Sequence, residues 1–415
     1  MKIRSITYFD NLRWPLNDVR VQQAGEFIQA AGNAFQAGGF EVQTTRIASA
    51  PFPLVLGEKT KDETMEFAYA LDELLTGLGF DYASIGPALP NCIESYQVIP
   101  EVLTNTQNVF AAGIISSPKD GISTQAIKQC AKVIKNNATI YQDGFANLRF
   151  AALANVPAGS PFLPAAFHDG SMKPGFAIAT EAADLAVSAI SNATSLDKAR
   201  DELIQSIEEV AGEIEKIGSS LASQFNLQFE GIDFSLAPYP TAEQSIGTAV
   251  EKLGVPGFGN HGSLAAIAVL AEAVERAQYS RVGFNGVMLP VLEDTILANS
   301  AVEDMLTIND LLLYSAVCGT GLDTIPLPGS VTEDQLYGVL LDLAVLAQRL
   351  GKPLTARLMP IPGKQAGDTT EFNFEFLANS KVMDLKAKPL AGHLSEDIYF
   401  NIQSRNSRSS NRGDL

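Results

Sequence analysis

Apolar runs of strand length alternate with segments whose apolar residues recur every three to four positions, from one end of the chain to the other. Such alternation is typical of βα crossovers, which produce a mainly parallel sheet with covered faces. Two sets of five strands favour a closed α/β barrel over an open sheet. The predicted strands are residues 2–7, 41–47, 81–86, 109–116 and 147–154, then 227–236, 282–289, 322–327, 355–361 and 372–383.

Segments with helical periodicity fill the gaps between these strands. They cover residues 18–37, 62–78, 123–136, 175–192, 195–224, 241–253, 263–277, 307–317 and 332–351. We therefore expect a single α/β barrel domain over residues 1–401, with halves at about 1–156 and 157–401. Residues 402–415 are rich in Ser, Asn and Arg, and we expect a disordered polar tail there.

The composition excludes disordered and fibrous classes, because 46% of the residues are hydrophobic and only 18% are charged. The formal net charge of −18 argues against nucleic acid and anionic membranes as partners, but a local pocket can still bind a small anion. No apolar run approaches the roughly 20 residues needed to span a bilayer. Three widely spaced cysteines and the absence of a signal peptide predict reduced thiols and a cytoplasmic location.

Two of the three histidines lie in loops that precede a predicted helix. His168 lies in the loop 164–170, and His261 lies in Gly259-Asn260-His261-Gly262 before a helix. Loops at strand ends carry ligands in α/β proteins, so both are candidates for proton transfer or metal ligation. A histidine that caps a helix or bonds a carbonyl is an equally good interpretation of each.

The glycines at 257, 259 and 262 match the dinucleotide-binding pattern GxGxxG. A dinucleotide fingerprint requires a strand directly upstream, whereas the preceding segment is predicted to be helical. The missing upstream strand therefore argues against NAD as a cofactor, although backbone N–H groups at the helix start could still hold an anion.

Cys318 precedes two glycines in Cys318-Gly319-Thr320-Gly321, which suggests exposure and close backbone access. A catalytic thiol and a packed cysteine are both open interpretations of this residue.

Acidic residues stand at the ends of apolar runs, notably Asp233, Glu293 and Asp323. An unpaired carboxylate there costs several kcal/mol, so each needs a partner, a metal or a raised pKa. Arg357 and Lys364 are the candidate partners, either in structural ion pairs or as contacts for a carboxylate or phosphate.

Several of these motifs occur in a fixed order between residues 231 and 368. They are Asp233 to Pro238, Gly259 to Gly262, Glu293-Asp294, Cys318 to Asp323, Pro326 to Gly329, and Arg357 to Asp368. In these motifs the chain resembles an uncharacterised domain-of-unknown-function family whose fold is grouped with pyruvate formate-lyase and the large subunit of ribonucleotide reductase.

The resemblance implies a ten-stranded α/β barrel of two five-stranded halves. In the radical enzymes of this fold a cysteine on a loop inside the barrel attacks the substrate as a thiyl radical, and Cys318 is the comparable position. The chain lacks the C-terminal glycyl radical loop, so the radical mechanism is not carried over, and fold kinship alone supplies no reaction.

These observations lead to the hypothesis of a non-radical enzyme that acts on a small anionic metabolite. The predicted catalytic residues are Cys318, His261, His168, Asp323 and Glu293, and the predicted substrate-binding residues are Arg357, Lys364, Asp233 and Ser235. Thiol, imidazole or carboxylate chemistry, a divalent metal and a homo-oligomer stay open. The alternative is a non-catalytic regulatory protein that binds a metabolite.

Overall fold

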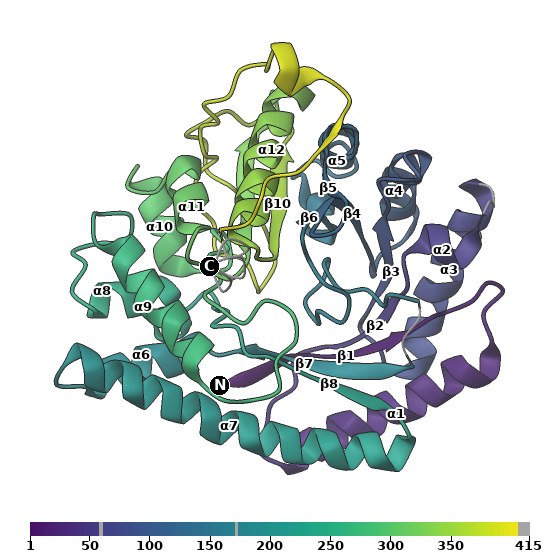
Figure 1. Cartoon of the computed structure of the whole chain (residues 1–415), viewed down its shortest axis with the longest axis horizontal. Coiled ribbons are helices and arrows are strands. Elements are labelled where there is room, and N and C mark those ends of the chain that lie inside the picture. The colour runs from purple at the N-terminus through teal and green to yellow at the C-terminus, as the bar shows by residue number, and fades with distance from the viewer. Residues whose placement is uncertain (58–60, 171–172, 406–415) are drawn as a thin grey trace, which may run out of the picture.

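The computed structural model describes residues 1–57, 61–170 and 173–405, which form one large curved sheet with helices along its outer side (Figure 1). The strands are β1 (Lys2–Asp10), β2 (Thr45–Ser49), β3 (Tyr82–Ala88), β4 (Val109–Ser117), β5 (Gly121–Ser123), β6 (Phe150–Ala154), β7 (Gly175–Glu181), β8 (Gln228–Asp233), β9 (Gly321–Pro328), β10 (Leu354–Ile361) and β11 (Tyr399–Phe400).

Helices alternate with the strands along most of the chain. They are α1 (Asp18–Ala37), α2 (Phe52–Leu56), α3 (Lys61–Leu78), α4 (Glu94–Asn105), α5 (Thr124–Ala138), α6 (Ala183–Asn192), α7 (Leu196–Phe225), α8 (Ile246–Lys252), α9 (Ser263–Arg276), α10 (Thr295–Val302), α11 (Ile308–Tyr314) and α12 (Glu333–Leu350). Short 3₁₀ turns cover Phe145–Arg149, Ala242–Gln244 and Gly392–Ser395.

The sheet contains two groups of parallel strands that run in opposite directions. The strand order is β8-β7-β1-β2-β3-β4-β6-β10-β9. Strands β1, β2, β3, β4 and β6 are parallel neighbours, as are β7 with β8 and β10 with β9. The two groups meet in antiparallel pairs at β1–β7 and at β6–β10. The fold is thus a mixed α/β fold, and β8 and β9 are the two ends of this strand order.

A bridging segment, residues 280–291, lies between those two ends. On one side the Leu236 N–H, just beyond β8, donates to the Gly286 carbonyl at 2.8 Å. On the other side the Val291 N–H donates to the Asp323 carbonyl in β9 at 3.1 Å. The segment makes isolated parallel bridges to both neighbours, so it contacts both ends of the sheet without forming a continuous strand.

The prediction of a helix over residues 175–192 is wrong in its first part. Residues Gly175–Glu181 form β7, whose seven residues are all buried between β1 and β8, and the helix begins only at Ala183. The alanines of this segment favour a helix locally, but two neighbouring strands satisfy its backbone and override that preference.

The prediction of a strand over residues 372–383 is also wrong, because the described backbone there is irregular. The Asn379 side chain accepts from the Phe372 N–H at 2.7 Å and donates back to the Phe372 carbonyl at 3.3 Å. An asparagine that binds local backbone offers an alternative to a strand ladder.

Other differences are smaller. Residues 282–289, predicted as a strand, belong to the bridging segment, and helices α2, α4 and α10 were not predicted. Within the predicted tail, residues 406–415 lie outside the described residues, while the Arg405 N–H donates to the Arg349 carbonyl at the end of α12.

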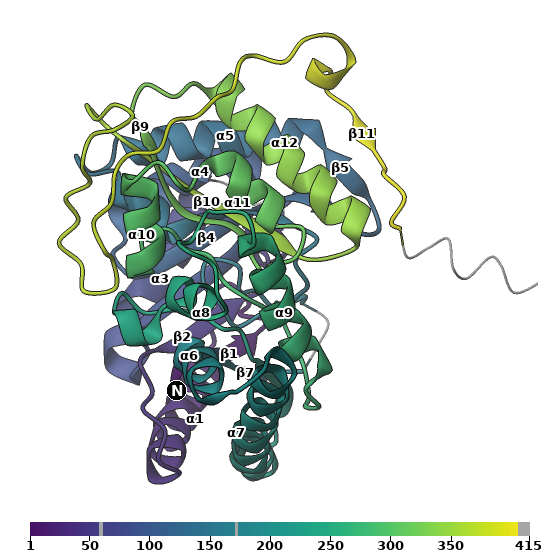
Figure 2. The same cartoon turned by 90° about the vertical axis from the view of Figure 1, so that its left-hand side faces the viewer.

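The chain beyond β10 returns along the outer face of the fold and passes α12 and α5 (Figure 2). The Tyr337 hydroxyl of α12 donates to the Leu394 carbonyl at 2.5 Å, and β11 then pairs with β5. Within residues 1–57, 61–170 and 173–405, no helix has the length and apolar character to cross a membrane.

Two glycines allow the bridging segment to approach the loop before β9. A Cβ at Gly286 would lie 2.7 Å from the Cα of Gly319, and a Cβ at Gly319 would lie 2.9 Å from the Cα of Gly286. The Gly319 N–H donates to the Val287 carbonyl at 2.7 Å across this contact. Any side chain at either position must push the segment away from β9.

We therefore predict that Gly286→Ala lowers the free energy of unfolding by about 1–3 kcal/mol, the usual cost of overpacking. The matched control is Gly212→Ala in the middle of α7, where no atom lies within 4 Å of the new Cβ. There alanine should stabilise the protein by roughly 0.5–1 kcal/mol. Chemical denaturation of both variants checks this, and equal effects would contradict the close packing.

Candidate active site

A cavity of about 260 Å³ lies inside the curved sheet, lined by residues from both groups of strands. Its charged lining consists of Arg4, Arg46, Arg149, Arg357, Glu293 and Asp323. Its aromatic lining consists of Tyr82, Phe110, Phe145, Phe162, Phe284, Phe374 and Phe376. A concave apolar pocket with a few convergent charged groups is the usual form of a small-molecule site.

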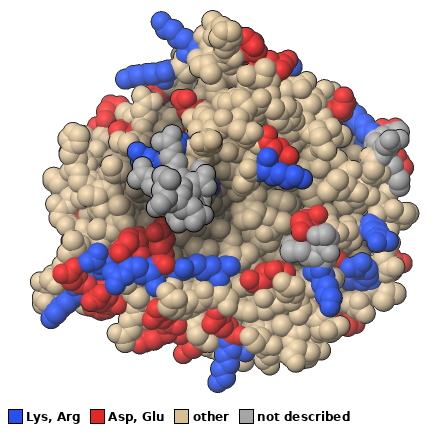
Figure 3. All heavy atoms as spheres, viewed as in Figure 1, with Lys and Arg blue, Asp and Glu red and all other residues tan. Residues whose placement is uncertain are grey.

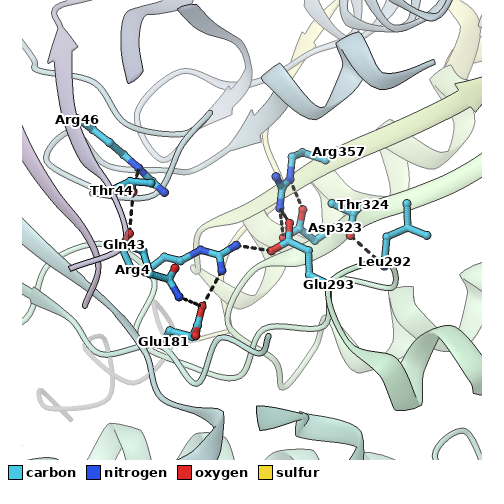
Figure 4. Close-up of polar contacts among 10 residues, drawn as sticks. All are labelled: Arg4, Gln43, Thr44, Arg46, Glu181, Leu292, Glu293, Asp323, Thr324 and Arg357. Atoms are coloured by element: carbon cyan, nitrogen blue, oxygen red, sulfur yellow. Dashed lines mark hydrogen bonds and ion pairs between the residues drawn. The ribbon is translucent and has the colours of Figure 1, made fainter. Parts of the chain in front are cut away.

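Five charged side chains form a continuous chain of alternating sign across the interior (Figure 4). Arg4 of β1 binds Glu181 of β7 and Glu293, each with a nitrogen–oxygen distance of 2.7 Å. Arg357 of β10 binds the other oxygen of Glu293 at 2.7 Å and both oxygens of Asp323, with Nη2 2.9 Å from Oδ2. We call these five residues the charge chain.

Asp323 and Arg4, two residues of the charge chain, each stand where the register between neighbouring strands shifts. Asp323 and Thr324 of β9 together face the single residue Arg357 of β10, and Thr324 has a φ of +46°. Arg4 is likewise the extra residue where β1 shifts against β7. A bulge re-aims the side chain at its position, and bulges are frequent beside functional sites.

The pKa values of the two carboxyl groups that line the cavity shift in opposite directions. Burial alone raises the pKa of Glu293, but Arg357 and Arg4 hold this pKa below its ordinary value. Burial raises the pKa of Asp323, and the charge of Glu293 adds to that rise while Arg357 opposes it. Glu293 is therefore the more strongly ionised of the two.

Among the described residues, Arg46 is the cavity arginine whose guanidinium bonds neither a carboxylate nor a backbone carbonyl. Its Nε donates to the Thr44 hydroxyl at 3.0 Å, and this hydroxyl in turn donates to the Arg4 carbonyl at 2.7 Å. Among the described residues no carboxylate lies within ion-pair distance of Arg46. Burial, reinforced by the nearby charge of Arg4, lowers the pKa of Arg46 to about 9.

Arg149 is held differently. Its guanidinium donates to the backbone carbonyls of Leu103 at 2.5 Å, Thr106 at 2.8 Å and Val109 at 3.2 Å. These three bonds fix the side chain between the end of α4 and the start of β4. Burial lowers the pKa of Arg149 from its ordinary value.

Two buried polar atoms of the lining residues have no hydrogen-bond partner within the described part of the chain. They are Gln43 Oε1 and Thr320 Oγ1, while Gln43 Nε2 donates to Glu181 at 2.7 Å. A buried unpaired acceptor costs about 1–3 kcal/mol, so a hydrogen-bond donor from a ligand would be favourable at these atoms.

The structure brings three of the predicted site residues together. Glu293, Asp323 and Arg357 meet in the charge chain and line the cavity. The predicted partnership of Arg357 with these acids is thereby confirmed. Lys364 instead lies 3.2 Å from Glu371 and is not among the lining residues.

The predicted thiol and imidazole groups lie elsewhere. Cys318 is buried in the main hydrophobic core, and its carbonyl accepts from Lys352. His261 is exposed before α9. His168 is fully buried; its Nδ1 accepts from the Gly170 N–H at 3.0 Å and its Nε2 has no partner. None of the three is a lining residue of the cavity.

Asp233 and Ser235, predicted to bind substrate, hold the bridging segment. The Ser235 hydroxyl donates to Asp233 at 2.6 Å, and the backbone N–H groups of Phe284 and Asn285 donate to the same carboxyl at 2.7 and 2.9 Å. Neither residue lines the cavity. Burial raises the pKa of Asp233 to about 6, and the three hydrogen bonds oppose this rise.

Sequence reasoning missed Arg4, Arg46, Arg149 and Glu181. Arg4, Arg46 and Arg149 are each the single arginine within a predicted strand, and this isolation was the available signal. Within the described residues, no three or more His, Cys, Asp and Glu side chains are grouped so that they could hold a metal ion.

We predict that Asp233→Asn removes one pH-dependent component of stability. Because the folded pKa of about 6 exceeds the ordinary value of 3.8, the native protein binds more protons between these pH values and loses stability as the pH rises. The wild type should therefore lose about 2 kcal/mol more than the variant between pH 4 and pH 7. Chemical denaturation across this range checks the difference, and parallel pH profiles would contradict it.

Comparison with known proteins gives relatives along most of the chain. A UPF0210 protein of Methanopyrus kandleri is 28% identical over 388 residues, covering 89% of this chain and 86% of its own. One from Clostridium beijerinckii is 28% identical and covers 91% and 87%. One from Pyrobaculum aerophilum is 31% identical and covers 80% and 76%. Residues 1–379 match the family described as "Uncharacterised ACR (DUF711)", and the chain belongs to this family of uncharacterised proteins.

Proposed function

We propose that the cavity binds a small anionic metabolite and that the protein is an enzyme that moves a proton on this molecule. The observation that carries the proposal is Arg46, a buried guanidinium without a carboxylate partner among the described residues. Its pKa of about 9 reflects the cost of its charge in this position. A bound anion would remove that cost, because a charge-assisted hydrogen bond satisfies the guanidinium.

The charge balance of the site supports the same proposal. The lining holds four arginines, Arg4, Arg46, Arg149 and Arg357, and two carboxylates, Glu293 and Asp323. Glu181 pairs with Arg4 without lining the cavity, and counting it leaves one positive charge over. The face drawn in Figure 3 carries acidic and basic side chains interspersed around a central hollow, with no single sign of charge dominating it. Anion selectivity would come from the cavity itself.

The proposal includes a closed barrel around the cavity. The bridging segment accepts a hydrogen bond from Leu236 and donates one to Asp323, and these two bonds support closure of the barrel between β8 and β9. The two parallel groups, joined by antiparallel pairs, agree with the two-halved barrel that the resemblance to pyruvate formate-lyase implies. A closed wall would exclude bulk water and strengthen each electrostatic interaction inside.

The opposite pKa shifts of the two carboxyl groups support proton transfer. Environments that push the pKa values of two neighbouring acids apart are typical of acid–base pairs in enzymes. Asp323, with the raised pKa, would exchange a proton with the bound molecule. Glu293 would stay ionised and keep Arg4 and Arg357 in position.

One observation favours the alternative, a regulatory protein that binds a metabolite without changing it. Both oxygens of Glu293 and both oxygens of Asp323 already accept from arginine. A carboxylate has about four acceptor positions, so these bonds leave room for a substrate proton but do not require one. Turnover must therefore be tested separately from binding.

We predict that Arg46→Gln abolishes anion binding without unfolding the protein. Thermal unfolding in formate, acetate, benzoate and phosphate should show stabilisation of the wild type by at least one of these anions, and none for the variant. Arg276→Gln on the exposed end of α9 is the control, because Arg276 pairs only weakly with Glu272 at 3.5 Å. The unliganded Arg46→Gln protein should be at least as stable as the wild type, because an uncompensated buried charge is lost. Equal stabilisation of all three proteins would contradict an anion site at Arg46.

We predict that Asp323→Asn retains anion binding but loses proton transfer. The wild type is incubated in D₂O with pyruvate, phenylpyruvate and other carboxylates that carry acidic C–H groups, and deuterium uptake is followed by mass spectrometry. The wild type should exceed the spontaneous rate, and the variant should be slower by about 10²–10⁴-fold, the usual contribution of a general acid–base group. Anion binding without any accelerated exchange would favour the regulatory alternative.

A further inference from the structure

We infer that the site selects a monocarboxylate attached to a single flat aromatic ring, such as an aryl or arylalkyl carboxylic acid. This inference rests on the proposed anion-binding function and adds the chemical class of the ligand. It follows from three features of the cavity: the planar guanidinium of Arg46, the aromatic side chains beside it, and the volume available.

The first feature sets the anionic group. A guanidinium presents its N–H donors as a planar fork that matches the two oxygens of a carboxylate. When Glu181, the partner of Arg4, is counted, the four arginines exceed the carboxylates by one positive charge, which one bound carboxylate neutralises. A phosphate dianion would bring a second negative charge close to Glu293 and Asp323 and would be repelled. The cavity therefore fits a carboxylate better than a phosphate.

The second feature sets the neighbouring part of the ligand. Arg46 and Tyr82 are register partners on the parallel strands β2 and β3, so their side chains lie side by side on one face of the sheet. The Tyr82 ring packs edge-on against Phe110, with the ring centroids 5.3 Å apart. A carboxylate bound to Arg46 would thus carry its substituent along an aromatic wall.

A second aromatic wall comes from the irregular segment that follows β10. The Phe374 ring packs edge-on against Phe145 and also contacts Phe376, each at 5.2 Å between centroids. Phe376 lies under the guanidinium of Arg4 at 5.5 Å. Aromatic rings prefer such edge-to-face and offset contacts, so these walls favour a flat ring over an alkyl chain.

The third feature limits the size. The cavity measures about 260 Å³, whereas a dry protein cavity of about 150 Å³ holds one benzene molecule. One ring and one carboxylate fit this space, but a nucleotide with its base, sugar and phosphates does not. The unpaired acceptor atoms Gln43 Oε1 and Thr320 Oγ1 would further favour a ligand with a hydroxyl or amino group on the ring or its side chain.

The test is calorimetric titration of the full chain with probes that separate these features. Benzoate and phenylacetate carry both groups, benzamide lacks the charge, acetate and cyclohexanecarboxylate lack the ring, and phenyl phosphate replaces the carboxylate. Each probe is titrated into the wild type, Arg46→Lys, Arg46→Gln, Phe374→Leu and the control Arg276→Gln. Arg46→Lys keeps the charge but removes the planar fork.

We expect benzoate or phenylacetate to bind the wild type at least tenfold more tightly than every other probe. Arg46→Lys should weaken this binding about tenfold and Arg46→Gln about a hundredfold. Phe374→Leu should weaken the aromatic carboxylates several-fold but leave acetate unchanged, and Arg276→Gln should match the wild type. Selective loss of the aromatic probes would show that the ring is recognised as well as the charge.

The outcomes that overturn the inference differ from those that overturn the proposed function. Binding of phenyl phosphate, acetate or cyclohexanecarboxylate as tightly as benzoate, with loss in Arg46→Gln, would refute the aromatic carboxylate class and keep an anion site at Arg46. Probes that bind equally to the wild type and Arg46→Gln, or to neither, would refute both.

Discussion

The charge chain from Glu181 through Arg4, Glu293 and Arg357 to Asp323 is the interaction on which the interior of this protein depends. Each member is buried or nearly so, and an isolated charge in such a place would cost several kcal/mol. Because the signs of the charges alternate, every residue of the charge chain has an oppositely charged neighbour. The charge chain also connects β1 and β7 with β9 and β10. The chain holds three carboxylates and two arginines, each with a partner of opposite sign inside it. Arg46 takes no part in these pairs and is the guanidinium that we propose for a ligand.

The bridging segment and its contacts position the middle of the charge chain. The bridging segment is fastened to β8 by Asp233, which accepts from the backbone N–H groups of Phe284 and Asn285, and it reaches β9 through the glycine contact. Glu293 follows directly after this segment, so the path of the segment decides where the middle of the charge chain lies. Residues away from the cavity therefore position the carboxylate that neighbours any bound molecule.

The sequence indicated much of the sheet but only part of the site. Acids at strand ends require partners, and this argument correctly joined Arg357 to Asp323 and Glu293. The same argument could not identify Arg4 as a further partner. Arg4 stands where the register of β1 shifts against β7, and this shift depends on pairing between strands 170 residues or more apart in the sequence. The pattern of residues 175–192 predicts a helix where β7 lies, because the burial of β7 between two strands is not visible locally. Cys318 and the two loop histidines do not line the cavity, because a position in a loop does not fix the distance between side chains.

Anomalous diffraction from crystals soaked in bromide tests whether an anion binds at Arg46 inside the cavity. Bromide is a small monoanion, so its binding does not depend on the shape of the natural ligand. We expect an anomalous peak within hydrogen-bond distance of the Arg46 guanidinium, and its loss in crystals of Arg46→Gln. Bromide peaks confined to the outer surface, with none in the cavity, would contradict an anion site at Arg46.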